Sequence, residues 1–404
     1  MLYLIVGGGV AGVTAAQAIV RADPAARVSV LGAEPVPYYY RPRLWEFIAG
    51  QIEQDALTFR SLTWYAERGI DLRLGKRVTA IDPVVHRLTL ADGSHAGYDR
   101  LLLATGAHSF VPSFEGIDKE GVFTLRTLDD ALAIRAYAQD VGSVAVIGGG
   151  LLGLETARSL LSLGLEVTVI EFVPRLLPRQ LDVEGAQVLQ SRLEAMGLHI
   201  LTGVATDAIL GSERATGVRL KDGRVIDGRL VLISTGIRSE IGLAREAGLA
   251  VDRGVVVDEQ LRTSATDIYA AGDVAEFEGT VYGIIPAAIE QARVAAANMI
   301  ADGSAVYRGT VPATTLKIVG IDLTSLGEAT AAGDELVVLR QAEPGTGVYR
   351  RLALRDGKIV GAILLGDTQG SQPLKQLIAT GRDVSAYGDR LLDKSFDLKA
   401  LAHG

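Results

Sequence analysis

The sequence predicts an α/β protein in which two Rossmann-like domains with parallel sheets are followed by a C-terminal α+β domain. Three observations lead to this prediction. Two glycine-rich segments, around Gly7 and Gly148, each join a short apolar run to a helix-forming stretch. The segments that follow them repeat the same turns at the same spacing, and the residues after about position 305 alternate strand-like runs with turns.

The two glycine-rich segments carry the pattern that binds the pyrophosphate of a dinucleotide. Their glycines are Gly7, Gly9 and Gly12 in the first segment and Gly148, Gly150 and Gly153 in the second. The first glycine of this pattern makes a tight turn, the second lets a pyrophosphate approach the backbone, and the third lets the helix pack on the strand. The phosphates would lie at a helix N-terminus, where free amides and the helix dipole favour anions.

A suitably placed acid accompanies each glycine segment. Glu34 ends one strand-like run and Glu171 ends another, 22 and 18 residues after the third glycines. A carboxylate about 20 residues after the motif typically binds a ribose hydroxyl. One such turn alone is readily explained without a ligand, but two copies with two acids predict two dinucleotide sites.

An internal repeat extends beyond the glycine segments. Asp-Gly turns at 92–93 and 222–223 are each followed, 13 residues after the turn glycine, by the glycine of a Thr-Gly pair, Thr105-Gly106 and Thr235-Gly236. Asp-Gly is the preferred chemistry of a tight two-residue hairpin turn. The repeat predicts two related α/β units with parallel cores.

A third signal follows the second unit. Gly272 and Asp273 end a strand-like run in small residues, so the backbone can approach a ligand while the carboxylate accepts from a hydroxyl. An ordinary turn at a strand end is the alternative. Pro286 then opens a strong helix, at or near its preferred first position.

Composition narrows the classes of function. With 48% hydrophobic and 22% charged residues the chain has enough apolar material for large cores. A net charge of -8 disfavours a nucleic-acid partner, and no apolar run reaches the roughly 18 residues of a membrane span. The chain contains no cysteine, which excludes disulfides, thiolate metal ligands and thiol redox relays. We expect no metal site, no leader segment and a cytoplasmic protein.

These motifs resemble the FAD-dependent pyridine-nucleotide oxidoreductases, and their order matches that family from residue 1 to about 303. The segments that carry the resemblance are Gly7/Gly9/Gly12, Ala104-Thr105-Gly106, Gly148/Gly150/Gly153 and Gly272-Asp273. The resemblance implies that the first site holds FAD and the second NADH. Glu34 would then bind the FAD adenosine ribose, Asp273 the ribityl chain, and the helix after Pro286 would face the flavin pyrimidine edge. Gly236 would complete the second nucleotide site.

The same resemblance bears on the choice of nucleotide. Glu171 would bind the 2′-hydroxyl of NADH and repel the 2′-phosphate of NADPH. Arg175 lies close enough in sequence to reach a phosphate, so both nucleotides stay open with NADH preferred.

The segment from Tyr38 to Glu46 is similar to the thiol-free branch of the family, which includes rubredoxin and ferredoxin reductases and the flavin module of nitrite reductase. Arg41 would line the flavin phosphates or ring edge, unless it is a solvated loop arginine. Many members of that branch have a lysine, paired with a glutamate, where this chain has Glu46. The matching glutamate is Glu155, our candidate catalytic residue, and a second carboxylate near it would push one of the pair toward protonation.

The predicted domains are an FAD domain of residues 1–108 and 230–304, an NAD domain of residues 109–229, and a C-terminal α+β interface domain of residues 305–404. Strands are expected at 315–321, 336–339, 349–354 and 358–365, with a turn at 356–357 and a helix from 371 to about 380. In the family this last domain covers the flavin or forms a dimer, so a homodimer is possible. Lys317 would approach the flavin or, more simply, be a strand-edge charge.

The function that the resemblance implies is electron transfer from NADH through FAD to a small redox protein, rubredoxin or ferredoxin. Such carriers are usually acidic, and a basic docking patch could include Arg41, Arg43, Arg350 and Arg351. Alternatives are an NADH oxidase, and an NADH-oxidising partner of a nitrite reductase or oxygenase. A non-enzymatic protein that senses redox state through FAD and NADH is a third interpretation.

Overall fold

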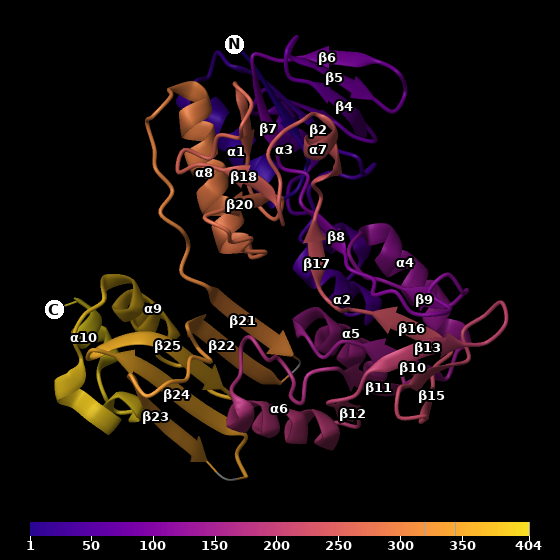
Figure 1. Ribbon diagram of the computed structural model, residues 1–404, viewed down its shortest axis with the longest axis vertical. Coiled ribbons are helices and arrows are strands. Elements are labelled where there is room, and N and C mark those ends of the chain that lie inside the picture. The colour runs from indigo at the N-terminus through magenta and orange to yellow at the C-terminus, as the bar shows by residue number, and fades with distance from the viewer. Residues whose placement is uncertain (319, 344, 404) are drawn as a thin grey trace. The chain divides into compact units, whose positions relative to one another are not determined.

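The computed structural model describes residues 1–318, 320–343 and 345–403. The chain forms two compact units, and each takes its residues from three segments. The first unit consists of Met1–Arg43, Ile52–His108 and Ile237–Thr310, and the second of Leu44–Gln51, Ser109–Gly236 and Val311–Gly404. Each unit is described by itself (Figure 1).

The core of the first unit is a five-stranded parallel sheet in the order β19-β7-β1-β2-β3. Its strands are β1 (Leu2–Val6), β2 (Arg27–Leu31), β3 (Ile70–Arg73), β7 (Arg100–Leu103) and β19 (Ile268–Ala270). Strands β1, β2, β7 and β19 are almost entirely buried, as expected for parallel strands covered on both faces, whereas the edge strand β3 is partly exposed. The two long helices of this unit, α1 (Val10–Ala22) and α8 (Ile285–Ile300), pack against each other (Figure 1).

Smaller elements complete the first unit. An antiparallel sheet contains β4, β5 and β6, and two-stranded sheets pair β8 with β17 and β18 with β20. Their bounds, with those of the short helices, are β4 (Val78–Asp82), β5 (Arg87–Leu90), β6 (His95–Gly97), β8 (Ala107–Ser109), β17 (Ile237–Ser239), β18 (Val255–Val257), β20 (Ala275–Phe277), η1 (Arg41–Arg43), η2 (Gln54–Leu57), α3 (Leu62–Ala66) and α7 (Gly242–Glu246).

The second unit repeats this plan. Its five-stranded parallel sheet has the order β12-β11-β10-β16-β9, and a three-stranded antiparallel sheet of β13, β14 and β15 accompanies it. The strands are β9 (Val122–Phe123), β10 (Ser143–Ile147), β11 (Glu166–Glu171), β12 (His199–Thr202), β13 (Thr206–Leu210), β14 (Gly217–Leu220), β15 (Val225–Asp227) and β16 (Leu230–Ile233). The helices are α2 (Leu44–Ile48), α4 (Leu128–Tyr137), η3 (Ala138–Asp140), α5 (Leu151–Ser162) and α6 (Val183–Ala195).

The pairing of β16 differs from one predicted domain boundary. Residues 230–233 were expected to open the return segment of the first domain, but β16 pairs with β10 along its whole length. These residues therefore lie in the second sheet, and the chain returns to the first unit at Ile237.

The C-terminal part of the second unit is an antiparallel sheet in the order β21-β22-β25-β24-β23, with helices α9 and α10 packed together beside it (Figure 1). Its elements are β21 (Ala313–Ile318), β22 (Ile321–Gly327), β23 (Leu336–Glu343), β24 (Val348–Arg355), β25 (Lys358–Leu365), α9 (Ser371–Thr380), η4 (Ser385–Leu392) and α10 (Leu398–His403). The single strand expected at 315–321 is wrong, because Gly320, with φ +80°, lies between two strands. The Lys317 side chain lies outside the described part of the chain.

The three Asp-Gly turns differ in geometry. At 356–357 both residues have positive φ, 49° and 74°, as a tight two-residue turn requires. At Gly93 and Gly223 the loop is one residue longer: Leu90 N donates to Ser94 O, and Leu220 N to Arg224 O. In these two turns only the glycine has positive φ, so the predicted two-residue turns are wrong.

Candidate functional site

The first glycine turn joins β1 to α1, and packing explains two of its three glycines. Gly7 has φ +117°, and a Cβ there would lie 2.0 Å from the Ala104 carbonyl oxygen. A Cβ at Gly12 would lie 1.9 Å from the Gly7 carbonyl oxygen. A Cβ at Gly9 would meet no atom within 4 Å, so nothing in the protein itself requires a glycine there.

The second turn, between β10 and α5, has the same geometry. A Cβ would lie 2.2 Å from Ser234 O at Gly148 and 2.2 Å from Gly148 O at Gly153, whereas Gly150 again faces open space. Gly9 and Gly150 are also the N-caps of their helices and provide no capping side chain. Two open turns at two uncapped helix N-termini fit a pyrophosphate in each unit.

Glu34 in the first unit has two side-chain partners. The Tyr39 hydroxyl donates to Glu34 Oε2 at 2.6 Å, and Arg41 forms an ion pair with Glu34 Oε1. Arg41 therefore lies beside the predicted ribose acid. Tyr39 is a residue that the sequence analysis missed, since three consecutive tyrosines give no indication of which one is buried.

The strand that leads to Gly106 lies in the same unit. Ala104 N donates to Val6 O beside the glycine turn. Thr105 Oγ1 donates to Glu240 O at 3.2 Å, and Gly106 follows with φ +75°. This segment thus forms one wall of the first glycine turn.

Glu171 in the second unit is held by the backbone. Its Oε2 accepts from Gly149 N at 2.6 Å and its Oε1 from Val173 N at 2.7 Å, and only 9% of the residue is exposed. The carboxylate is thereby fixed against the glycine turn. The Arg175 guanidinium donates to the carbonyl oxygens of Leu181 and Pro178, so it is already engaged within its own loop. Gly236 has φ +109° and no atom within 4 Å of its Cβ position.

The segment at Gly272 and Asp273 packs on two helices. Gly272 has φ +86°, a Cβ there would lie 3.0 Å from the Ala11 Cβ, and its amide donates to Gln291 Oε1 at 2.8 Å. Ser239 Oγ donates to the Asp273 carbonyl oxygen. Gln291 is 1% exposed, and its side chain lies beside the buried Tyr307 hydroxyl.

Pro286 occupies the first turn of α8, as predicted. The helix begins at Ile285, and no side chain at its N-cap accepts a hydrogen bond from its first amides. Gln291 projects from the same helix, and no sequence motif had indicated it.

Glu155 and Glu46 lie on neighbouring helices of the second unit. Ser159 Oγ of α5 donates to Trp45 O of α2 at 2.9 Å, which holds the two helices together. Burial, followed by the negative charge of Glu46, raises the pKa of Glu155 to about 8. Glu155 is therefore mostly protonated at neutral pH. The direction is the one expected from the sequence, but burial is the larger cause.

This pKa predicts a pH-dependent stability. Between about pH 5 and about pH 8 the folded chain keeps the Glu155 proton, whereas the unfolded chain releases it near 4.5. Stability should therefore fall as pH rises through this window, and Glu155→Gln should make the fall smaller. Thermal unfolding of both proteins at the two ends of the window checks this. Identical pH dependence in the two proteins would contradict the protonated state of Glu155.

Two arginines that the sequence assigned to a docking patch are buried. Arg350 is 4% exposed and pairs with Asp367 at 2.7 Å, and Arg351 is 1% exposed and donates to the carbonyl oxygens of Ala329 and Ala331. Both face protein partners because β24 is covered on both sides. Their assignment to a docking surface is wrong.

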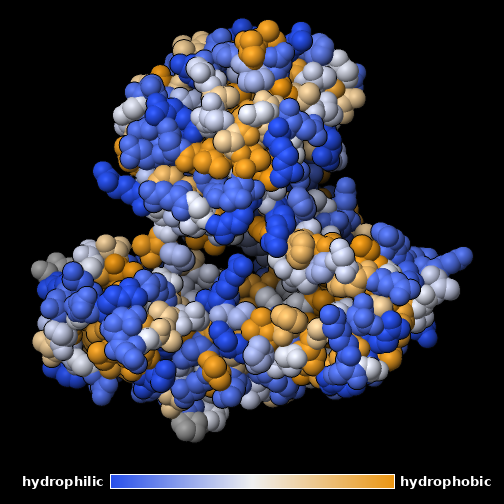
Figure 2. Space-filling view, in the orientation of Figure 1, coloured by the Kyte–Doolittle hydropathy of each residue, from blue (hydrophilic) through white to orange (hydrophobic). Residues whose placement is uncertain are grey.

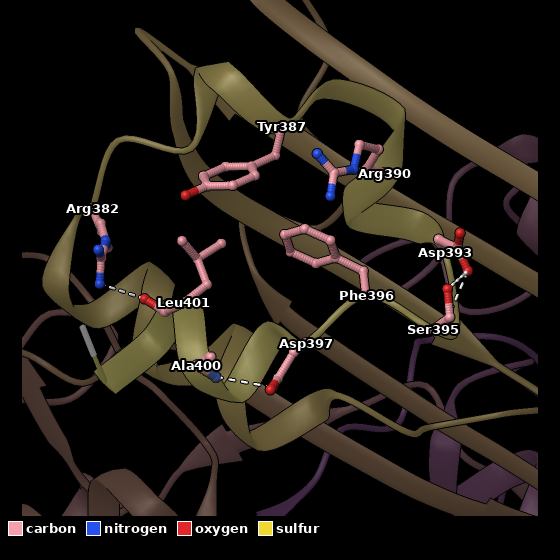
Figure 3. Close-up of a pocket in the computed structure, with 9 residues that line it drawn as sticks. All are labelled: Arg382, Tyr387, Arg390, Asp393, Ser395, Phe396, Asp397, Ala400 and Leu401. Atoms are coloured by element: carbon pink, nitrogen blue, oxygen red, sulfur yellow. Dashed lines mark hydrogen bonds between the residues drawn. The ribbon is translucent and has the colours of Figure 1, made fainter.

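A pocket of about 480 Å³ lies in the C-terminal segment, away in sequence from all the predicted cofactor residues. Figure 3 shows the Tyr387 and Phe396 rings facing its interior, with Arg390 beside them. The two rings make an edge contact at 5.4 Å, and the Arg390 guanidinium lies 5.4 Å from the Phe396 ring centre. The pocket thus belongs to the packing of the C-terminal helices.

Hydrophilic residues cover most of the face in Figure 2, and apolar residues are scattered among them. Over the described part of the chain, no helix is both long and apolar enough to span a bilayer.

Comparison with known proteins identifies the family. Residues 1–298 match the family "Pyridine nucleotide-disulphide oxidoreductase", and residues 312–382 match "Rubredoxin NAD+ reductase C-terminal domain". The chain is 30% identical over 380 residues to the NADH-rubredoxin oxidoreductase of Clostridium acetobutylicum, covering 94% of each protein. It superposes on putidaredoxin reductase, from a covalent complex with putidaredoxin, with a TM-score of 0.89 and 27% identity, covering 99% of this chain and 97% of the other.

A longer relative matches as well. The chain is 36% identical over 384 residues to the NAD(P)H nitrite reductase of Bacillus subtilis, covering 95% of this chain and 48% of that protein. The chain spans about half the length of the nitrite reductases of Bacillus subtilis and Escherichia coli that it matches. The fold class and the family resemblance predicted from the sequence are confirmed. The chain belongs to the pyridine nucleotide-disulphide oxidoreductase family, and it carries the C-terminal domain of the rubredoxin NAD+ reductases.

Proposed function

We propose that this protein passes electrons from NADH through bound FAD to a small redox protein, rubredoxin or ferredoxin. The observation that carries the proposal is the pair of glycine turns whose middle glycines, Gly9 and Gly150, face open space at uncapped helix N-termini. The chain has no cysteine, so electrons cannot pass to a thiol of the protein itself. Relatives named as rubredoxin and putidaredoxin reductases match over nearly their full length.

In this proposal the first unit holds FAD and the second holds NADH. Gly7, Gly9 and Gly12 receive the FAD pyrophosphate, Glu34 with Tyr39 and Arg41 receives its ribose, and Asp273 receives its ribityl chain. Gly148, Gly150, Gly153 and Glu171 do the same for NADH, with Gly236 at the edge of that site. Bound FAD would supply the chemistry that takes up a hydride and gives out single electrons. In this proposal the NAD domain ends at Gly236, because the chain re-enters the first unit at Ile237.

Glu171 and Arg175 support NADH over NADPH. The Glu171 carboxylate is fixed by two backbone amides, so it remains in place to accept from a 2′-hydroxyl and to repel a 2′-phosphate. Arg175 bonds two carbonyl oxygens of its own loop and would have to break these bonds to meet a phosphate.

A second candidate function follows from the nitrite reductase match. The chain matches 48% of that relative, so in this second function the electrons would pass to a partner outside the 384 matched residues. Such a partner would be a nitrite-reducing or oxygenase component, and the chemistry of the two nucleotide sites would be unchanged.

Stopped-flow reoxidation of the NADH-reduced protein tests the proposal. We expect fast reoxidation by at least one rubredoxin or ferredoxin, slow reoxidation by oxygen, and no loss of activity after treatment with iodoacetamide, because no thiol is present. Reoxidation by oxygen as fast as by any carrier would instead identify an oxidase. A lasting reduced complex that no carrier reoxidises would favour the redox-sensing alternative.

A further inference from the structure

Phe172 is an exposed aromatic residue that directly follows a buried acid. The side chain follows Glu171 directly at the end of β11, and 74% of the residue is exposed. Glu171 before it is 9% exposed, and Leu176 and Leu177 in the same loop are 0% exposed. An exposed phenylalanine forgoes the favourable burial of a large apolar ring.

The backbone around Phe172 is held in place on both sides. Val173 N donates to the Glu171 carboxylate at 2.7 Å, and Val204 N donates to the Glu171 carbonyl oxygen at 3.1 Å. Gly203 N donates to the carbonyl oxygen of Val173 at 3.0 Å. The ring therefore projects from a fixed position rather than from a loose loop.

The exposed Phe59 in the first unit is different. Its ring contacts Tyr38 and Tyr40, at centre distances of 5.5 and 5.8 Å, and the Arg60 guanidinium lies over it. Within the described residues, the Phe172 ring contacts neither another aromatic ring nor a cation. One face of the Phe172 ring is thus open to a flat ligand.

We propose that the adenine of NADH stacks on the Phe172 ring. The proposal rests on the function proposed above, in which Glu171 binds the adenosine ribose. Adenine is attached to that ribose, and Phe172 is the residue next to the acid. A planar base and a planar apolar ring stack favourably in any sequence context. Phe172 would then add affinity for the adenosine half of NADH and none for the nicotinamide half.

The test measures binding of ADP-ribose to the full-length, FAD-bound protein by titration calorimetry. Phe172→Leu keeps an apolar side chain without a flat ring, and Phe172→Trp keeps a flat ring. We expect the leucine variant to bind ADP-ribose about 5- to 50-fold more weakly, and the tryptophan variant to bind within about twofold of the unmodified protein. Val225→Ala, at a residue 59% exposed on the hairpin strand β15, is the control and should change nothing.

A second readout separates the two halves of the nucleotide. Reduced nicotinamide mononucleotide lacks adenosine, so Phe172→Leu should lower the apparent affinity for NADH relative to that for the mononucleotide. Equal ADP-ribose affinity in the leucine variant and the unmodified protein would overturn the role of Phe172, and would point to a contact with another protein. Failure of the unmodified protein to bind ADP-ribose, together with no flavin reduction by NADH, would overturn the proposed function itself.

Discussion

Gly150→Ala is expected to fold normally and keep FAD while losing NADH affinity, and Gly9→Ala is expected to lose FAD. Both glycines have backbone angles that alanine adopts easily, φ -80° in each, and an added Cβ would meet no protein atom within 4 Å. The added methyl would instead keep a phosphate from the helix amides. Charge-assisted hydrogen bonds contribute about 1.5–3 kcal/mol each, so each affinity should fall about 10- to 150-fold.

Flavin absorbance after purification and calorimetric titration with NADH measure the two losses. Each variant is the control for the other, because the substitution is the same and only the unit differs. Gly153→Ala is the contrasting change, since its Cβ would lie 2.2 Å from Gly148 O and should disturb the fold of the second unit. Normal binding of both ligands to both middle-glycine variants would show that the turns do not hold phosphates.

Asp182→Ala is expected to destabilise the second unit by about 3–5 kcal/mol. Asp182 caps α6 by accepting from Gly185 N, and it also accepts from the Tyr349 hydroxyl at 2.7 Å. The buried Arg351 lies 3.3 Å from the same carboxylate. Removing the carboxylate leaves a guanidinium that is 1% exposed without its counter-charge.

Urea unfolding followed by circular dichroism measures this loss. Asp207→Ala is the matched control, because Asp207 on β13 pairs at 2.7 Å with Arg219 on β14 and both side chains are 42% exposed. The control should cost less than about 1 kcal/mol. If Asp182→Ala lowered the free energy of unfolding as little as the control does, the contact between α6 and the C-terminal sheet would contribute little to stability.

The parts of the structure that the sequence predicted depend on local chemistry. Some signals act over a few residues, such as a glycine that needs positive φ, an apolar run, or a proline in the first turn of a helix. The sequence therefore predicted the turns at Gly7 and Gly148 and the helix start at Pro286. The repeated spacing then predicted two related α/β units with parallel cores. The family resemblance implied the role of Glu155, and the spacing from the glycine motifs indicated the ribose acids. Both assignments stay predictions.

The parts that were missed depend on distant partners. Two adjacent arginines in a strand normally place one side chain in water, yet Arg350 and Arg351 are both buried. Their partners, Asp367 and the carbonyl oxygens of Ala329 and Ala331, come from other segments of the fold. Gln291 was missed for the same reason, because its bond to Gly272 N joins residues 19 positions apart.

The two parallel sheets take their strands from different stretches of the chain, and this has a consequence for synthesis on the ribosome. All five strands of the second sheet lie between Val122 and Ile233, whereas the first sheet needs β19, which begins only at Ile268, and α8 ends at Ile300. The nascent chain can therefore form the whole second sheet while the first sheet still lacks β19. We therefore expect the second parallel sheet to be completed before the first one during synthesis.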